Sequence, residues 1–324
     1  MFAYLVRRLL YAIPILLGVI LITFVLSFVV QSPQTRAKVV LGQRATPQAV
    51  AEWLHNRGYN KPRFFNTAPG ANLFDSQFFN HVTKLATFRL GVSDVTGRDL
   101  RDVFKEGAVP SLLITVPAFL VGLMLAVSLA LYQVFVRDTP LDTLGALAAV
   151  ALMSVPPMVY IIFGQAVVAL GLNYFPAFGF DLSGLTTLKF LLLPVTLMAV
   201  MYLGSHVRLY RAIFLEEIGQ DYVRTAQAKG VSNERLLFTH VLKNGMIALI
   251  TLVVAHLPLL VMGSLLVENF FGIPGLGNTL FLAIQQGDFA TVFASVYLGS
   301  ILYLAGLILT DICYALVDPR IGLS

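Results

Sequence analysis

Charged and hydrogen-bonding side chains gather in one stretch of an otherwise apolar sequence, residues 220–244, which reads QDYVRTAQAKGVSNERLLFTHVLKN. Its side chains suit ion pairing and the docking of a partner, and the chain shows no His/Asp/Glu cluster or Ser–Lys spacing for bond-making chemistry. Because only 12% of the residues are charged, a loop this polar is expected to face water on one side of a membrane. We therefore interpret this polar loop as a docking segment. The alternative is an ordinary interfacial loop, since Ala, Gly and Lys are common in helices.

Local signals divide the polar loop into two short helices with a break at Gly230. A carboxylate at Asp221, a cation at the other end and a glycine suited to a C-terminal cap predict a first helix over 222–229. A second short helix is predicted to begin after the N-cap Ser232 and to end near Lys243. Small residues of the first helix leave a thin surface that a partner could approach closely: Thr225, Ala226 and Ala228.

The composition indicates an all-α membrane protein. Hydrophobic residues make up 57% of the 324, and the mean hydropathy is +0.81. A charge at the bilayer centre costs on the order of 3 kcal/mol, so uncharged windows locate the membrane-spanning helices. Such windows predict six transmembrane helices, within residues 9–35, 107–136, 143–180, 190–207, 244–267 and 289–310.

These windows also predict how the chain is organised. A first transmembrane helix over 1–30 is followed by an extracytoplasmic segment over 31–105. A five-helix core over 106–318 contains the loop 215–244, and a short tail over 319–324 ends the chain. The first helix is predicted to be a retained anchor, because its apolar run exceeds a signal-peptide core and no A-x-A site follows.

Irregular segments are predicted where Gly, Pro and aromatic residues cluster. Residues 47–56 predict a short amphipathic helix, and residues 58–62 a turn. Residues 171–176 mark a helix end followed by an aromatic interfacial segment. Residues 272–277 cannot hold a lipid-facing helix, because free backbone groups find no partner in hydrocarbon, so they predict an extracytoplasmic elbow that leads into an interfacial helix.

The distribution of charge predicts the orientation. A cytoplasmic N-terminus places ten Lys or Arg residues on that side, against Lys189 alone on the short outer loops. Six crossings then place the C-terminus and the polar loop in the cytoplasm. The net charge of +5 is modest and fits this orientation, so nucleic acid is not an expected partner. The single cysteine, Cys313, excludes an internal disulfide and a cysteine-based metal cluster, and no metal site is expected.

The polar loop resembles the cytoplasmic coupling loop of permease subunits of ABC importers, through Ala226, Gly230 and Leu242. It departs from the general pattern at four positions whose residues are usual in dipeptide and oligopeptide permeases: Arg224, Thr225, His240 and Lys243. Further stretches resemble signatures of that branch and follow in the same order: 154–157, 170–176, 267–277 and 317–321.

The resemblance implies a pore-forming permease subunit, similar to dipeptide and oligopeptide permeases of the B type, in the bacterial cytoplasmic membrane. It implies as partners a second homologous permease in a heterodimer, two ATPase subunits, an extracytoplasmic substrate-binding protein and lipid. ATP and Mg would be held by the ATPase subunits, so no cofactor is expected in this chain. Coupling to the ATPase is assigned to eight residues: Tyr222, Arg224, Thr225, Ala226, Ala228, Lys229, Gly230 and His240. The substrate path is not assigned, and the cargo is left open among peptides, nickel, glutathione, heme and antimicrobial peptides.

The chain carries no energy source of its own that the sequence can identify. No G-x-x-x-x-G-K-[ST] motif occurs, so the chain is not expected to be an enzyme that hydrolyses ATP. The carboxylates that a coupled carrier would place at mid-membrane are predicted near span ends: Asp142, Glu268, Asp288 and Asp311. His206 and His256 fall within spans, either as proton sensors or as packed histidines.

Several alternatives stay open at this level. The chain is either a permease driven by ATPase partners, a stand-alone carrier or channel, or a structural subunit of a membrane complex. The extracytoplasmic segment either contacts a binding protein or caps the bundle. Prolines within the spans suit either a gated path or irregular packing.

Overall fold

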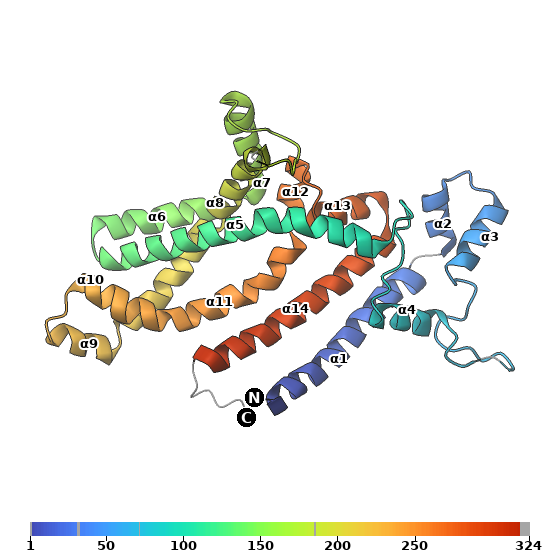
Figure 1. The fold of residues 1–324 in the computed structure, drawn as a ribbon, viewed down its shortest axis with the longest axis horizontal. Helices are drawn as coiled ribbons and strands as arrows, with labels where there is room; N and C mark the ends of the chain where they lie inside the picture. The colour runs from blue at the N-terminus through green and yellow to red at the C-terminus, as the bar shows by residue number, and fades with distance from the viewer. Residues whose placement is uncertain (1, 31–32, 71, 185, 318–324) are drawn as a thin grey trace. The chain divides into compact units, whose positions relative to one another are not determined.

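The computed structural model describes residues 2–30, 33–70, 72–184 and 186–317, and these residues form the predicted all-α fold (Figure 1). No strand occurs among them, and an isolated β-bridge joins Val92 to Asp99. In chain order the α-helices and π-helices are α1 (Phe2–Phe24), η1 (Val25–Val30), α2 (Pro33–Leu41), α3 (Pro47–Asn56), α4 (Gln77–Ala86), α5 (Leu100–Phe135), α6 (Pro140–Ser154), α7 (Pro157–Phe163), η2 (Gly164–Gly171), α8 (Thr186–Ile218), α9 (Asp221–Ala228), α10 (Asn233–Arg235), η3 (Leu236–Val241), α11 (Leu242–Met262), α12 (Leu265–Phe271), α13 (Leu276–Gln286) and α14 (Phe289–Val317).

Within the described residues, five helices are long and apolar enough to cross a membrane. They are Val6–Phe24, Leu100–Phe135, Thr186–Ile218, Asn233–Met262 and Phe289–Cys313. Two further pairs of shorter helices pass the same test only if each sharply bent pair counts as one span. The chain is therefore a multi-pass membrane protein with five to seven candidate spans, a range that includes the predicted six. The C-terminal stretch 318–324, which holds most of the predicted 317–321 signature and the tail, lies outside the described residues.

The third predicted span is bent rather than straight. Helix α6 ends at Ser154 and α7 begins at Pro157, with an angle of 88° between the two halves. Two consecutive prolines lack backbone N–H groups and restrict the residue before them, so the helix cannot continue through this point. The predicted helix end at 171–176 is present, because η2 stops at Gly171.

The predicted elbow at 272–277 is also present. Helix α12 ends at Phe271, and Gly272 follows with a left-handed φ of 66°, which a residue without a side chain adopts readily. Helix α13 then starts at Leu276, and the two helices meet at 85°.

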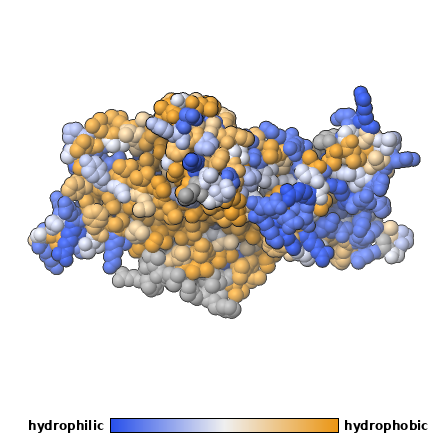
Figure 2. Space-filling view, turned by 45° about the horizontal axis from the view of Figure 1, so that its top comes forward, coloured by the Kyte–Doolittle hydropathy of each residue, from blue (hydrophilic) through white to orange (hydrophobic). Residues whose placement is uncertain are grey.

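The chain is divided into two compact units: residues 1–107 with 279–305, and residues 108–278 with 306–323. In the second unit, close approach of α6 and α8 depends on Gly204, because a Cβ there would collide with the carbonyl oxygen of Ala149. Many large hydrophobic side chains are exposed, and they cover much of the face that Figure 2 shows. Such a surface is expected of helices that lie in lipid or pack against another subunit.

In the first unit, helix α4 packs on the last turns of α1. The ring of Phe24 is fully buried, and its centroid lies 5.2 Å from that of Phe78 in α4. One turn earlier, Ile20 packs in a buried cluster with Leu85. The short helix predicted at 47–56 is α3, with the same bounds, and the side chain of Thr46 caps its first turn.

Buried carboxylates fix the 93–94 turn to the start of α14 within this unit. Asp94 accepts hydrogen bonds from Arg36 Nη2 at 2.9 Å and from Arg57 Nε at 3.0 Å. Asp288, just before α14, accepts from the backbone N–H of Asp94 at 3.0 Å and from the hydroxyl of Ser93. Opposite charges thus offset the desolvation of the buried ionic groups, which makes this cluster costly to break.

Acidification is expected to loosen the first unit through His81. Burial lowers the pKa of His81 to about 4, and the nearby Lys84 and Arg36 lower it further. In the unfolded chain this pKa is about 6.5, so the unfolded state takes up the proton first as the pH falls. The stabilising contribution is complete above about pH 6.5 and is lost toward pH 4, by at most about 3 kcal/mol. Trp53, the single tryptophan, lies in the same unit, so its fluorescence measures the acid-induced unfolding of this unit.

The matched control is His81→Gln, which keeps a polar group beside Thr23 Oγ1, 3.4 Å from the ring nitrogen Nε2. This variant should unfold with a flatter dependence on pH between 4 and 6.5. An unchanged acid profile in the variant would assign the effect to other groups.

Candidate functional site

The predicted first helix of the polar loop is α9, and Gly230 ends it as a cap. Gly230 has a φ of 79° and donates its N–H to the carbonyl of Gln227 at 2.9 Å. The next N–H, of Val231, reaches back to the carbonyl of Ala226 at 3.2 Å. This pair of bonds, with a hydrophobic contact alongside, is the Schellman arrangement that terminates helices at a left-handed residue. The cap predicted from the sequence is confirmed.

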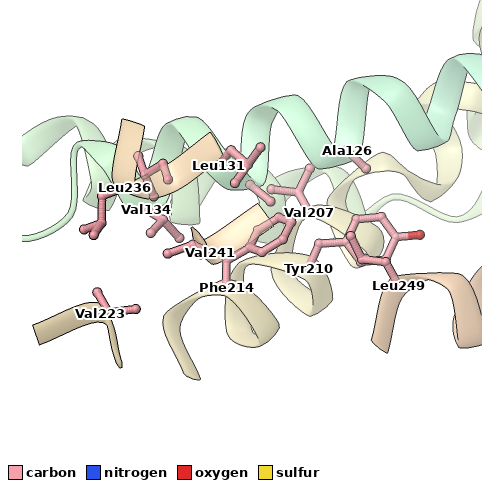
Figure 3. Close-up of a cluster of buried hydrophobic side chains, with 12 residues drawn as sticks. Ala126, Leu131, Val134, Val207, Tyr210, Phe214, Val223, Leu236, Val241 and Leu249 are labelled. Atoms are coloured by element: carbon pink, nitrogen blue, oxygen red, sulfur yellow. The ribbon is translucent and has the colours of Figure 1, made fainter. Parts of the chain in front are cut away.

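Val223 is the fully buried side chain by which α9 packs on the rest of the second unit. It is fully buried in a hydrophobic cluster drawn from α5, α8, α9, η3 and α11 (Figure 3). Its neighbours in that cluster include Val134 of α5, Phe214 of α8 and Val241 of η3. Because four other elements contribute to the cluster, a displacement of α9 acts on all of them at once.

The structure corrects the prediction that three small residues share one thin outer surface. Ala226 is half-buried and packs against the cluster, because it lies three residues after Val223 on the same face of the helix. Thr225 and Ala228 are exposed, and the hydroxyl of Thr225 donates to the carbonyl of Asp221 at 2.9 Å.

We define the outer face of α9 by four of its exposed positions: Tyr222, Arg224, Thr225 and Ala228. The guanidinium of Arg224 lies 3.5 Å from Asp221, one turn earlier, and Lys229 is exposed at the end of the helix. An exposed ion pair such as Arg224–Asp221 contributes little to stability. The cations of Arg224 and Lys229 are therefore accessible to a partner.

The second helix of the polar loop is longer than predicted. Ser232 occupies the N-cap position, with no hydrogen bond from its side chain to the helix. The chain then continues through α10 and the π-helix η3 directly into α11, so no helix ends near Lys243. His240 lies half-buried in η3. The sequence has no glycine or proline that would end a helix between Ser232 and the apolar run that follows Lys243, so the helix continues into that run.

Tyr222 connects α9 to the end of α8. Its hydroxyl donates to Glu217 Oε2 at 2.6 Å. Partial burial raises the pKa of Tyr222, so the phenol stays protonated and keeps this role at neutral pH. Together with residues of α8 and α11, both side chains line an open hollow of about 1080 Å³ beside α9.

A second cavity, of about 610 Å³, lies between α5, α7, α8, α11 and α12 in the second unit. The two histidines predicted within spans both line it, with ring centroids 5.8 Å apart. The ring of Tyr210 stacks on His206 at 5.6 Å, and His256 Nδ1 donates to the carbonyl of Leu252 at 2.7 Å. The cavity has the size of a small-ligand pocket, and its described lining contains no Asp, Glu, Lys or Arg.

Glu268 is a buried residue that the sequence placed only near a span end. It is fully buried in α12 and accepts a hydrogen bond from Ser111 of α5 at 2.8 Å. The backbone N–H groups of Ser264 and Asn278 donate to it at 3.0 and 2.9 Å. Two glycines lie so close to the carboxylate that a Cβ on either would collide with it, namely Gly263 and Gly275, and a Cβ on Gly277 would collide with the backbone of Ser264 and Leu265. The sequence feature that could have indicated this buried acid is its position in an apolar window, within ten residues of the turn sequence G-I-P-G-L-G.

Comparisons with known proteins cover nearly the whole sequence. Residues 118–323 match the family model described as "Binding-protein-dependent transport system inner membrane component", and residues 1–93 match the model of the corresponding N-terminal region. The chain is 27% identical to the dipeptide transport system permease protein DppB of Alkalihalophilus pseudofirmus, across 99% of both chains. It is 29% identical to a putative peptide transport system permease of Brucella abortus, and 27% identical to the glutathione transport system permease GsiC of Salmonella typhimurium, again across 99% of both chains.

Proposed function

The chain belongs to the family of inner-membrane components of binding-protein-dependent transport systems, and from this premise we propose that it is the pore-forming permease subunit of an ATP-driven importer. The names of its relatives, which are peptide and glutathione permeases, support peptides or related small cargo as the substrate class. The observation that carries the proposal is α9, which is seated on the bundle by Val223 and leaves a polar outer face uncovered.

The geometry of α9 supports a mechanical role for that face. Residues Gly219 and Gln220 alone separate α9 from α8, and the turn at Gly230 leads to the helix that becomes α11. A partner that pushes on the outer face therefore moves a short, capped helix whose buried side packs on α5, α8 and η3. Close packing transmits such a displacement rather than absorbing it. The expected result is a tilt of the spans between inward-open and outward-open states.

The partners follow from this role. Two ATPase subunits supply the push and bind ATP and Mg, a second homologous permease completes the pore, and an extracytoplasmic protein delivers the cargo. Both termini and α9 then lie in the cytoplasm of a bacterial cell, as the distribution of Lys and Arg in the short loops favours. Arg224 and Lys229 are placed to pair with acidic groups of the ATPase.

Asp142 and Glu268 give little support to the alternative of an ion-coupled carrier. Asp142 pairs with Arg211 at 2.7 Å, and Glu268 is held by hydroxyl and backbone donors. Neither lines the 610 Å³ cavity, where a carrier would place a proton- or sodium-binding group. The lining of the cavity is mostly apolar, and its imidazole and hydroxyl groups supply the few polar contacts that a small cargo would need.

Uptake is expected to depend on nucleotide hydrolysis. The chain, the second permease, the ATPase subunits and the binding protein are reconstituted in proteoliposomes, with labelled dipeptide and labelled glutathione as probes. Accumulation should require hydrolysable ATP and should persist when an ionophore collapses ion gradients. Accumulation without the ATPase subunits would instead establish a stand-alone carrier. An assembled complex that hydrolyses ATP but never moves either probe or responds to loaded binding protein would favour a structural role.

A further inference from the structure

An ordered but exposed group of aromatic rings projects from the first unit between α3 and α4. We call residues 62–70 and 72–76 the aromatic loop. The side chains of Phe65 and Phe74 are 54% and 56% exposed, yet both rings pack on Phe79, with centroids 5.7 and 4.8 Å away. The backbone closes the loop on itself, since Asn66 N–H donates to the carbonyl of Leu73 at 3.0 Å. A packed aromatic surface that faces outward is typical of an interaction site.

The depth of this loop is set by its contact with α1. The candidate span of α1 ends at Phe24, and its ring lies 5.3 Å from the ring of Phe64, in the loop, and 5.2 Å from that of Phe78. Helix α4 crosses the final turns of α1 (Figure 1), with Leu85 against Ile20. The apolar helix continues as η1 to Val30, so the base of the aromatic loop lies beside the C-terminal part of this helix, within reach of the lipid around it.

Cations accompany the exposed rings at both ends of α4. Arg63 lies in the loop and is exposed, whereas Lys61, just before the loop, pairs with Asp75. After α4, Phe88 is 49% exposed and lies next to the exposed Arg89. Phe88 has a φ of 53°, a backbone conformation that bulky residues adopt only when their surroundings hold it. Aromatic rings next to Lys and Arg are the composition of the membrane–water interface.

We propose that the aromatic loop and Phe88 insert into the bilayer interface around the end of α1, so that they form, with α4 between them, a lipid anchor of the first unit. The rings enter the boundary of the acyl chains, and Arg63 and Arg89 reach lipid phosphates. Lipid is the occupant because this surface continues from an existing span and pairs apolar rings with cations. The inference does not depend on transport, since it concerns only how this unit meets the membrane.

The single native tryptophan makes the anchor directly measurable. In a Trp53→Phe background, Phe74→Trp places a fluorescent reporter in the loop, and Glu52→Trp, at an exposed site of α3, serves as the matched control. Both full-length variants are reconstituted in vesicles of phosphatidylglycerol and phosphatidylethanolamine with bromine atoms on the acyl carbons near the headgroup. The Phe74→Trp emission is expected to be quenched about twofold by brominated lipid and to shift to the blue, while the control is unaffected.

Two outcomes would overturn the proposal. The first is a Phe74→Trp reporter that brominated lipid leaves unquenched and aqueous iodide quenches as strongly as the Glu52→Trp control. The second is a reporter that lipid leaves unaffected but that a cargo-binding protein protects from iodide, which would make this surface a protein contact. Phe65→Trp provides an independent second reporter, and its agreement with Phe74→Trp is required.

Discussion

Tryptophan in place of Ala228 is expected to abolish the stimulation of ATP hydrolysis by cargo-loaded binding protein, with membrane insertion unchanged. Ala228 is exposed on α9 and lies one turn after Arg224, so a larger side chain there extends the outer face of the helix. A partner that must approach the outer face closely is held away by the indole ring. Loss of a contact at the centre of an interface costs about 2 kcal/mol or more, which corresponds to a loss of about 30-fold. Substrate-stimulated ATPase activity and uptake in proteoliposomes of the complete complex measure the effect.

Two controls separate docking from folding. Ala148→Trp, at an exposed position of α6, should leave stimulation intact. At Gly230, where φ is 79° and a Cβ would meet open space, asparagine tolerates the left-handed conformation and should preserve coupling. Valine does not, and Gly230→Val should impair coupling by undoing the cap. Ala226→Trp is a poor test, because this side chain packs on the core. Normal stimulation in both Ala228→Trp and Gly230→Val would exclude α9 from the mechanism.

Alanine in place of Glu268 is expected to be the most destabilising single change in the second unit. It removes the acceptor for the Ser111 hydroxyl and for the N–H groups of Ser264 and Asn278, all at a buried site. Leaving buried donors unpaired costs about 1–3 kcal/mol each, and a sum of about 4 kcal/mol lowers the melting temperature by roughly 10 °C. Thermal unfolding of the purified chain in detergent, followed by circular dichroism, provides the measurement.

Glu268→Gln serves as the matched variant, because its amide carbonyl still accepts part of this network. It should melt between wild type and Glu268→Ala. Glu216→Ala, which removes an exposed carboxylate of α8, should melt within about 1 °C of wild type, since exposed sites contribute little. If Glu268→Ala and Glu216→Ala melt together, the buried network does not hold the elbow between α12 and α13.

The features that the sequence predicted correctly depend on local backbone chemistry. The bounds of α3 follow from Thr46 and Pro47 at its start, the end of α9 from Gly230, and the elbow from the glycines and proline at 272–277. In each case one to three residues decide the conformation, so no tertiary information is needed. The family resemblance drawn from the motifs agrees with the matched family models for the same reason.

The features that the sequence did not predict depend on which face of a helix is buried. Ala226 and Ala228 have the same side chain, and only the packing of Val223 decides that Ala226 turns inward. Glu268 was expected near water, but glycines and Ser111 enclose it. Within a membrane, both lipid-facing and protein-facing surfaces are apolar, so hydrophobic periodicity carries little information about burial. The roles of the eight coupling residues remain predictions.

The carboxylate cluster of the first unit has a consequence for biosynthesis. Asp94 joins Arg36 and Arg57, which precede it in the sequence, but its turn is completed by Asp288 and by the N–H of Ala290, which are translated much later. Residues separated by about 195 positions must therefore meet before this unit is finished. Until α14 emerges, a buried turn and its charges lack part of their native surroundings. Nascent chains truncated before Asp288 should consequently stay open to protease digestion around residues 93–94.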